Sequence, residues 1–231
     1  MDAIEIEHLH KAYGDVVAVD DVSLTVRYGE IFGIIGVNGA GKTTTVECAA
    51  GLTRPDGGRL RVLGLDPVAE RDELRRRVGV QLQDSALPDR LTVTEALTLQ
   101  ASFYDDPVEP LELIEQLGLT HRRDARYGKL SGGEKQKLSV GLALVGRPQL
   151  AILDELTTGL DPHARRETWA LIADLKQRGL TVLLVTHFMD EVERLCDRVA
   201  LIHAGRVKTV GTPREVAGAR DLEDAFVELT A

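Results

Sequence analysis

The feature that most constrains this chain is a glycine-rich stretch, GVNGAGKTT, that begins at Gly36. Gly36, Gly41, Lys42 and Thr43 match the pattern G-x-x-x-x-G-K-[ST]. The stretch follows EIFGIIG, a nearly all-apolar run typical of a buried strand, and a helical pattern continues from Gly41 to Ala50. Glycines let the backbone wrap closely enough for its N–H groups to point at phosphate oxygens. The sequence therefore predicts a strand, a loop and a helix that together bind a nucleoside triphosphate.

The residues of this loop have distinct expected tasks. Lys42 would reach the β- and γ-phosphates, and the Thr43 hydroxyl would ligate Mg²⁺. We expect the whole loop to contact the nucleotide, through these residues: Gly36, Val37, Asn38, Gly39, Ala40, Gly41, Lys42, Thr43 and Thr44. The alternative is a glycine-rich turn with a purely structural role. It is disfavoured because the predicted strand and helix are the flanks that the motif requires.

An acidic pair follows a second apolar run, LAILDE, where a buried strand would end. Adjacent residues of a strand point to opposite faces, so Asp154 and Glu155 need not do the same job. Asp154 suits a hold on Mg²⁺, and Glu155 is then free to orient or deprotonate the attacking water. Alone, such a pair is often only a polar strand end. After the phosphate loop it indicates a site that hydrolyses the nucleotide.

Length and composition narrow the class of protein further. The chain has 231 residues, 43% of them hydrophobic, which is enough for one large domain. The formal net charge of −9 argues against general affinity for nucleic acid or anionic lipid. Two cysteines without metal-type spacing favour a reduced, cytosolic compartment. The sequence shows neither a signal peptide nor an apolar run of about 18 residues that could span a membrane.

Periodicity along the chain predicts an α/β fold with a mainly parallel core sheet. Alternation in AIEIEHL and VVAVDDVSLTV predicts an antiparallel β edge, with a turn at Tyr13 and Gly14. Residues 84–128 read as a helical insertion, in which Thr92 and Glu95 have the spacing of a capping box. Residues 205–231 read as the end of a hairpin and short helices. We expect one domain over residues 1–231.

A second anion-binding turn, LSGGEKQ, lies about a hundred residues after the first. The order of motifs resembles the ATP-binding subunit of ABC transporters, a family of P-loop NTPases, and it covers essentially the whole chain. Gln83 resembles the family's Q-loop glutamine, LSGGE (residues 130–134) the signature motif, and TTGLD (residues 157–161) the D-loop. His187 in VLLVTH resembles the switch histidine, and Tyr13 lies where the family stacks an aromatic ring on adenine. One departure is Leu156, which replaces the proline that usually follows the catalytic glutamate.

This resemblance implies roles that single residues could not establish. His187 would sense the γ-phosphate and act with Glu155 in catalysis, and Gln83 would contact the nucleotide and Mg²⁺. Without the resemblance, His187 would be structural, Gln83 a solvated strand end and Tyr13 turn packing. Ser131, Gly132 and Gly133 would contact ATP held by a neighbouring chain, because the family's domains associate head to tail. The partner would be a second copy or a homologous ATPase subunit.

The resemblance also implies a task at a membrane. A separate integral membrane permease would anchor the chain at the cytoplasmic face. Residues 84–105 would receive a helix of that permease in a groove that includes the exposed apolar side chains of Leu87 and Leu91. DELTTGLDP, THFMDEVERLCDRV and LEDAFVELT resemble the exporters that pump drugs, antibiotics or lipids. The interval between Gln83 and Ser131 is too short for the long coiled coil of the chromosome-structuring relatives. Two alternatives are the ATPase of an importer and a soluble, nucleotide-gated ABC ATPase.

Overall fold

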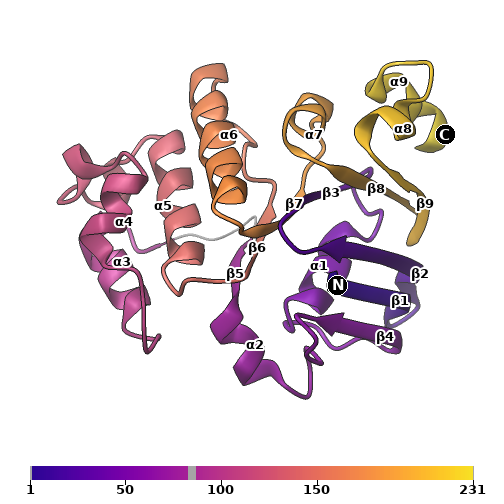
Figure 1. The fold of residues 1–231 in the computed structure, drawn as a ribbon, viewed down its shortest axis with the longest axis horizontal. Helices are drawn as coiled ribbons and strands as arrows, with labels where there is room; N and C mark the ends of the chain where they lie inside the picture. The colour runs from indigo at the N-terminus through magenta and orange to yellow at the C-terminus, as the bar shows by residue number, and fades with distance from the viewer. Residues whose placement is uncertain (1, 83–86, 231) are drawn as a thin grey trace.

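The structure, a computed structural model, describes residues 2–82 and 87–230. The described residues form a nine-stranded sheet in the order β4-β1-β2-β9-β8-β3-β7-β6-β5. Its strands are β1 (Asp2–Tyr13), β2 (Val16–Arg27), β3 (Ile31–Ile35), β4 (Gly57–Val62), β5 (Val78–Gln81), β6 (Leu150–Asp154), β7 (Thr181–Val185), β8 (Arg198–His203) and β9 (Arg206–Gly211). Figure 1 shows the antiparallel strands β1, β2 and β4 at one end of the molecule and helices α3, α4 and α5 at the other.

Helices connect the strands and cover the sheet. The α-helices are α1 (Lys42–Ala49), α2 (Arg71–Arg77), α3 (Val93–Ala101), α4 (Pro110–Gln116), α5 (Gly132–Leu144), α6 (Pro162–Gln177), α7 (Met189–Leu195), α8 (Pro213–Ala217) and α9 (Leu222–Thr230). Two 3₁₀ turns, Thr120–Arg122 and Tyr127–Lys129, lie between α4 and α5. None of the helices in the described part of the chain is both long and apolar enough to cross a bilayer.

The core sheet is parallel, as the sequence predicts. Strand β3 pairs in parallel with β7 and β8, and β6 pairs in parallel with β5 and β7. Every residue of β3, β6 and β7 is buried, because helices cover both faces of such a sheet. The carboxyl ends of these strands therefore meet along one edge, which is where the candidate site lies.

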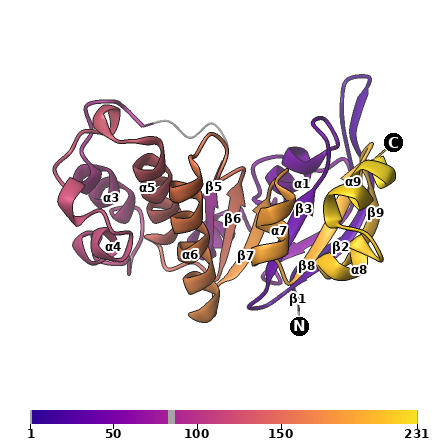
Figure 2. The same cartoon turned by 90° about the horizontal axis from the view of Figure 1, so that it is seen from above.

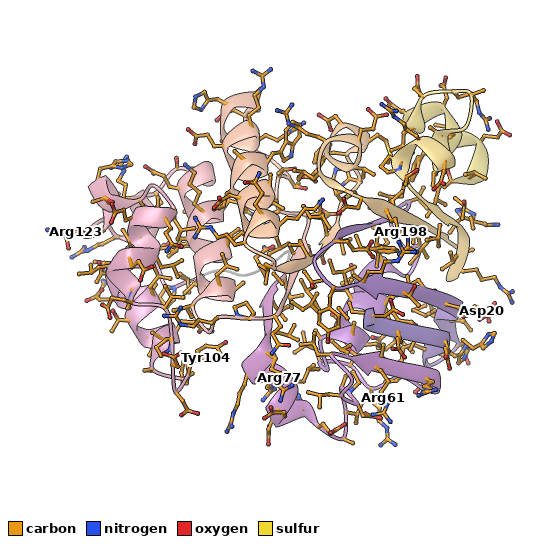
Figure 3. The ribbon with its side chains drawn as sticks, viewed as in Figure 1. Asp20, Arg61, Arg77, Tyr104, Arg123 and Arg198 are labelled. Carbon is orange, nitrogen blue, oxygen red and sulfur yellow. The ribbon has the colours of Figure 1, made fainter. Side chains whose placement is uncertain are left out.

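The predicted antiparallel edge is also present. Strand β1 pairs antiparallel with β2 and β4, and Gly14 turns the chain between β1 and β2 with a φ of +58°. Arg198 at the start of β8 joins this edge to the core: its Nη1 donates to the Thr25 carbonyl at 3.2 Å and to Glu30 Oε1 at 3.1 Å (Figure 3). These bonds connect the antiparallel edge to the parallel core, which carries the loop that begins at Gly36.

The described residues between 87 and 131 contain α3, α4 and the two 3₁₀ turns. The capping box forms at α3, where Thr92 N–H donates to Glu95 Oε2 at 2.8 Å and Glu95 N–H to Thr92 Oγ1 at 3.2 Å. A Cβ added to Gly141 of α5 would lie 2.5 Å from Leu117 Cδ1 and 3.4 Å from Leu97 Cδ2. Helix α5 therefore packs tightly on this insertion, and the helical layer continues past residue 128.

One expectation for this layer is wrong. Leu87 and Leu91 are half-buried against the core rather than exposed. The reason for Leu91 is backbone pairing, since its carbonyl accepts from Tyr127 N–H at 2.8 Å and this draws the segment inward. The exposed apolar side chains of the layer are instead Leu99 (54%), Phe103 (71%) and Leu111 (53%).

Candidate nucleotide site

The glycine-rich loop joins the end of β3 to the start of α1, and two close backbone approaches set its path. A Cβ on Gly36 would lie 2.2 Å from the Ile202 carbonyl oxygen of β8. A Cβ on Gly41 would lie 2.4 Å from the Ala18 carbonyl oxygen of β2, and the φ of Gly41 is +101°. Only glycine fits these positions without a shift of the backbone. The path of the loop is therefore set by its close approach to the backbones of β8 and β2.

The Lys42 ammonium lies inside this loop. Its Nζ donates to the Gly36 carbonyl at 2.8 Å and to the Val37 carbonyl at 3.0 Å. Burial lowers the pKa of Lys42, and the charges of Glu155 and Asp154 partly oppose that shift. A buried cation at a helix start that faces two carboxylates is arranged to receive phosphate and a metal ion.

A cavity of about 760 Å³ gathers the predicted catalytic side chains around the loop. Its lining comprises Val16, Val17, Ala18, residues 36–44, Glu155, His187 and Phe226. Val16, Val17 and Ala18 lie at the start of β2, whereas the loop, Glu155 and His187 follow the carboxyl ends of β3, β6 and β7. The structure thus brings together residues that are far apart in the sequence.

Asp154 ends β6 and is fully buried. In the part of the chain that the structure describes, neither of its Oδ atoms has a hydrogen-bond donor in reach. Desolvation, with the neighbouring charge of Glu155, raises the pKa of Asp154 to about 6. Buried carboxylate oxygens without a donor are the hard ligands that Mg²⁺ prefers, so this residue fits the expected metal.

Glu155 and His187 converge next to Asp154. Glu155 Oε1 lies 3.3 Å from His187 Nδ1, and Glu155 N–H donates to the Val185 carbonyl at 2.9 Å. Glu155 has a φ of +49°, so the chain turns sharply after β6. Leu156, which follows, is fully buried in the core. This leucine stands at the position where the family usually has a proline.

The signature motif lies elsewhere, at the start of α5. Ser131 is the N-cap: its Oγ accepts from Glu134 N–H at 3.3 Å, and its N–H donates to Glu134 Oε2 at 2.8 Å. Arg122 Nε donates to Glu134 Oε1 at 2.7 Å. Burial acts to raise the pKa of Glu134, but the hydrogen bonds from Ser131 and Arg122 outweigh it and hold the pKa at about 2. Residues 131–133 do not line the cavity of the phosphate loop.

One more predicted residue, Tyr13, is not brought to this cavity. Tyr13 is 48% exposed at the end of β1, and Lys11 Nζ lies 5.2 Å from the centroid of its ring. Tyr13 is not among the residues that line the cavity. Gln83 lies outside the described residues. Conversely, the prediction missed Phe226, which lines the cavity from α9 and carries no motif that could have identified it.

Comparison with known proteins decides the family. A family model described as ABC transporter matches residues 19–158, more than half of the chain. The chain belongs to the ABC transporter family. The solved structure of an ATP-binding subunit of an ABC transporter superposes on this ABC ATPase with a TM-score of 0.88 at 31% identity, over 99% of this chain and 100% of that one.

Relatives of this ABC ATPase include two exporter proteins. It is 42% identical over 217 residues to the Nod factor export ATP-binding protein I of Rhizobium sp. (strain N33), over 91% of this chain and 71% of that protein. The protein of the same name from Burkholderia lata is 42% identical over 216 residues, over 91% of this chain and 71% of that protein. Binding and hydrolysis of ATP follow from membership of the family.

Proposed function

We propose that this ABC ATPase hydrolyses ATP with Mg²⁺ at sites shared between two ATPase subunits, and that it thereby powers export through a separate permease. The observation that carries the proposal is the cavity in which the phosphate loop, Glu155 and His187 meet. That cavity combines a buried cation, a candidate base and a histidine at the carboxyl edge of a parallel sheet, where α/β proteins bind nucleotides.

Within this site each residue has a proposed task. The backbone and Lys42 hold the phosphates, while Thr43 and Asp154 hold Mg²⁺, which supplies charge neutralisation on the phosphate oxygens. Glu155 accepts a proton from the attacking water, and His187, at 3.3 Å from it, orients that carboxylate and contacts the γ-phosphate. Tyr13 and Gln83 remain proposed contacts to the base and to Mg²⁺, respectively.

The signature motif is proposed to act on the nucleotide of a partner subunit. The N-terminus of α5 is capped by its own Glu134, so the N–H groups of Gly132 and Gly133 are presented at an exposed helix start. Helix starts attract anions because of their unpaired N–H groups and dipole. We place the γ-phosphate of a neighbouring chain there, with a second copy or a homologue as that neighbour.

Export is supported by the relatives, two of which are named as ATP-binding proteins of Nod factor export. We propose that residues 1–231 act as one ABC ATPase domain in which 84–128 is an inserted helical subdomain and 205–231 a hairpin end with short helices. We further propose that a permease holds this domain at the cytoplasmic face of the membrane. The transported compound would be selected by that permease.

Replacement of the proposed base tests the function. Glu155→Gln keeps the size and reach of the side chain but cannot accept a proton. We expect turnover to fall by roughly a hundredfold or more, whereas ATP binding persists and a nucleotide-bound dimer accumulates on size-exclusion chromatography. Glu193→Gln, an exposed carboxylate of α7, is the matched control and should leave turnover unchanged. Wild-type turnover from Glu155→Gln would contradict the assignment.

A further inference from the structure

The nucleotide cavity has two chemically different ends. The charged side chains and the imidazole of its lining, Lys42, Glu155 and His187, belong to the phosphate loop and to the two predicted catalytic positions. The lining outside the loop and these two catalytic positions is apolar and comprises Val16, Val17, Ala18 and Phe226. Val16 and Val17 are 67% and 52% exposed, so their aliphatic side chains are accessible to a ligand in the cavity. A nucleotide has the same polarity, with charged phosphates at one end and an apolar-faced base at the other.

Phe226 reaches this cavity from the C-terminal helix α9. Leu222 and Ala225 of that helix are fully buried and anchor it on the body of the protein. The Phe226 ring itself is half-buried, partly against the core and partly at the cavity. Figure 2 shows α9 at the end of the molecule opposite α3 and α4. An anchored helix therefore brings an aromatic ring to the cavity that residues 16–18 of β2 also line.

The other proposed aromatic contact to the base, Tyr13, is not part of this cavity lining. The Lys11 ammonium already lies near the Tyr13 ring. Phe226 is the aromatic side chain of the cavity lining, together with the imidazole of His187 at the phosphate end. We propose that Phe226 of α9 forms an aromatic wall of the base-binding end and contacts the nucleobase of bound ATP. This inference rests on the proposed ATP site.

Contact with an aromatic ring explains why a base would prefer this position. Every nucleobase has a flat π face, and its stacking or edge contact with an aromatic side chain stabilises binding whatever the base. The valine pair of β2 would cover the base from the side of the sheet. Because the base then touches α9, nucleotide binding also stabilises the docking of the C-terminal helix, since a ligand that binds only the docked form favours that form.

Calorimetric titration with two ligands tests this contact. ATP carries a base, whereas inorganic tripolyphosphate carries only the phosphates. We expect Phe226→Ala to weaken ATP binding about tenfold and to change tripolyphosphate binding by less than about twofold. Leu229→Ala is the matched control, because Leu229 also packs from α9 against the core but does not line the cavity. It should leave both affinities unchanged.

A second variant gives a direct signal. Phe226→Trp keeps an aromatic ring at the cavity, and its fluorescence should be quenched by ATP but not by tripolyphosphate. The native Trp169 is buried in the core, where Nε1 donates to Glu191 Oε1 at 2.9 Å, so it provides a constant background.

The outcomes separate this inference from the function on which it rests. Equal loss of affinity for both ligands in Phe226→Ala, or the same loss in Leu229→Ala, would mean that α9 only supports the fold and would overturn the contact. Unchanged ATP affinity in Phe226→Ala would overturn it as well. Lys42→Ala should weaken both ligands; if it weakens neither, the ATP site itself is misplaced and the inference fails with it.

Discussion

The chain has two glycine-containing helix starts, at α1 and at α5, and their surroundings differ. At α1 the loop is enclosed by its own chain: a Cβ on Gly36 would lie 2.2 Å from the backbone of β8, and Lys42 is buried. At α5, Ser131 and Gly132 are exposed, and the nearest atom to a Cβ on Gly132 would be Leu160 Cδ2 at 3.6 Å. One start is enclosed, and the other faces outward.

This difference is what we expect if the same local pattern serves opposite purposes at the two helix starts. The cavity at the start of α1 has the carboxylate of Glu155 and the imidazole of His187 in its lining, which are the groups that the proposed hydrolysis uses. The start of α5 is rigidly capped by Glu134 and held by Arg122, yet it lies outside the cavity of its own loop. A capped, exposed helix start is suited to complete a site that belongs to another molecule.

The largest expected effect concerns the buried carboxylate of the enclosed region. The pKa of Asp154 is raised from 3.8 to about 6, so between these values the folded chain holds a proton that the unfolded chain has released. Stability therefore falls as the pH rises through this window, and above it the ionised carboxylate costs on the order of 3 kcal/mol. Asp154→Asn should recover roughly 1–3 kcal/mol at pH 8, because a neutral amide avoids that cost.

Denaturant unfolding without nucleotide or Mg²⁺ measures this effect. The gain in unfolding free energy should shrink toward zero as the pH approaches 4, and Asp190→Asn on exposed α7 should show no such trend. If the wild type is more stable than Asp154→Asn at pH 8, or if the difference in unfolding free energy does not depend on pH, the buried carboxylate does not destabilise the fold. Hydrolysis with Mg²⁺ should be lost in the same variant.

A pair of alanine substitutions compares the two helix starts directly. Gly36→Ala drives a Cβ into the Ile202 carbonyl at 2.2 Å and should destabilise the protein by about 1–3 kcal/mol. Gly132→Ala has room and should change stability by less than about 0.5 kcal/mol. Thermal unfolding of the isolated chain distinguishes them. Equal destabilisation by the two substitutions would mean that the start of α5 is packed as tightly within its own chain as the start of α1, which would contradict the comparison.

The sequence could predict the loop, the acidic pair and the parallel core because each depends on a local pattern. Glycine spacing, a run of apolar residues and an acidic strand end are visible within a few positions. The capping box at Thr92 is equally local, and both of its hydrogen bonds form. Helix α7 was not predicted, since it makes only about two turns and no capping side chain marks its start.

The remaining differences depend on contacts between distant segments. Leu91 is drawn inward by pairing with Tyr127, and Tyr13 is set by a hairpin turn and by Lys11. Phe226 reaches the cavity only because of where α9 docks. No sequence pattern near Phe226 predicts that position. Packing of this kind is decided by the whole fold and not by spacing.

The helical layer that contains α3 and α4 offers a test of partner binding. Substitutions there should leave the nucleotide site at α1 unaffected. Leu99 and Phe103 are exposed and four residues apart at the end of α3, which makes them candidates for the permease contact in place of Leu87 and Leu91. We expect Leu99→Asp with Phe103→Asp to lower transport about tenfold, a loss of about 1.4 kcal/mol of docking energy. Basal ATPase activity of the isolated subunit should not change.

Leu111 of α4 is the matched control for this surface, because it is exposed to a similar degree on the neighbouring helix. Leu111→Asp should preserve both transport and hydrolysis. Simultaneous loss of both activities in the α3 variant would indicate damage to the fold. Unchanged transport would place the permease contact elsewhere.

The smallest expected effect is also the most direct test of the comparison between the two helix starts. Mixing two differently damaged chains should restore at most one nucleotide site per dimer. Lys42→Ala damages the phosphate loop of one chain, and Gly132→Asp places a negative charge at the signature motif of another. Room at Gly132 means that its variant should fold. In a mixed dimer that closes head to tail, both lesions fall in one composite site and the other site is intact. Occluded nucleotide should then reach about one ATP per purified mixed dimer, half the wild-type value, and each variant alone should occlude none. If the signature motif acted within its own chain, every site would remain damaged, so a mixed dimer without occluded ATP would overturn the assignment in trans.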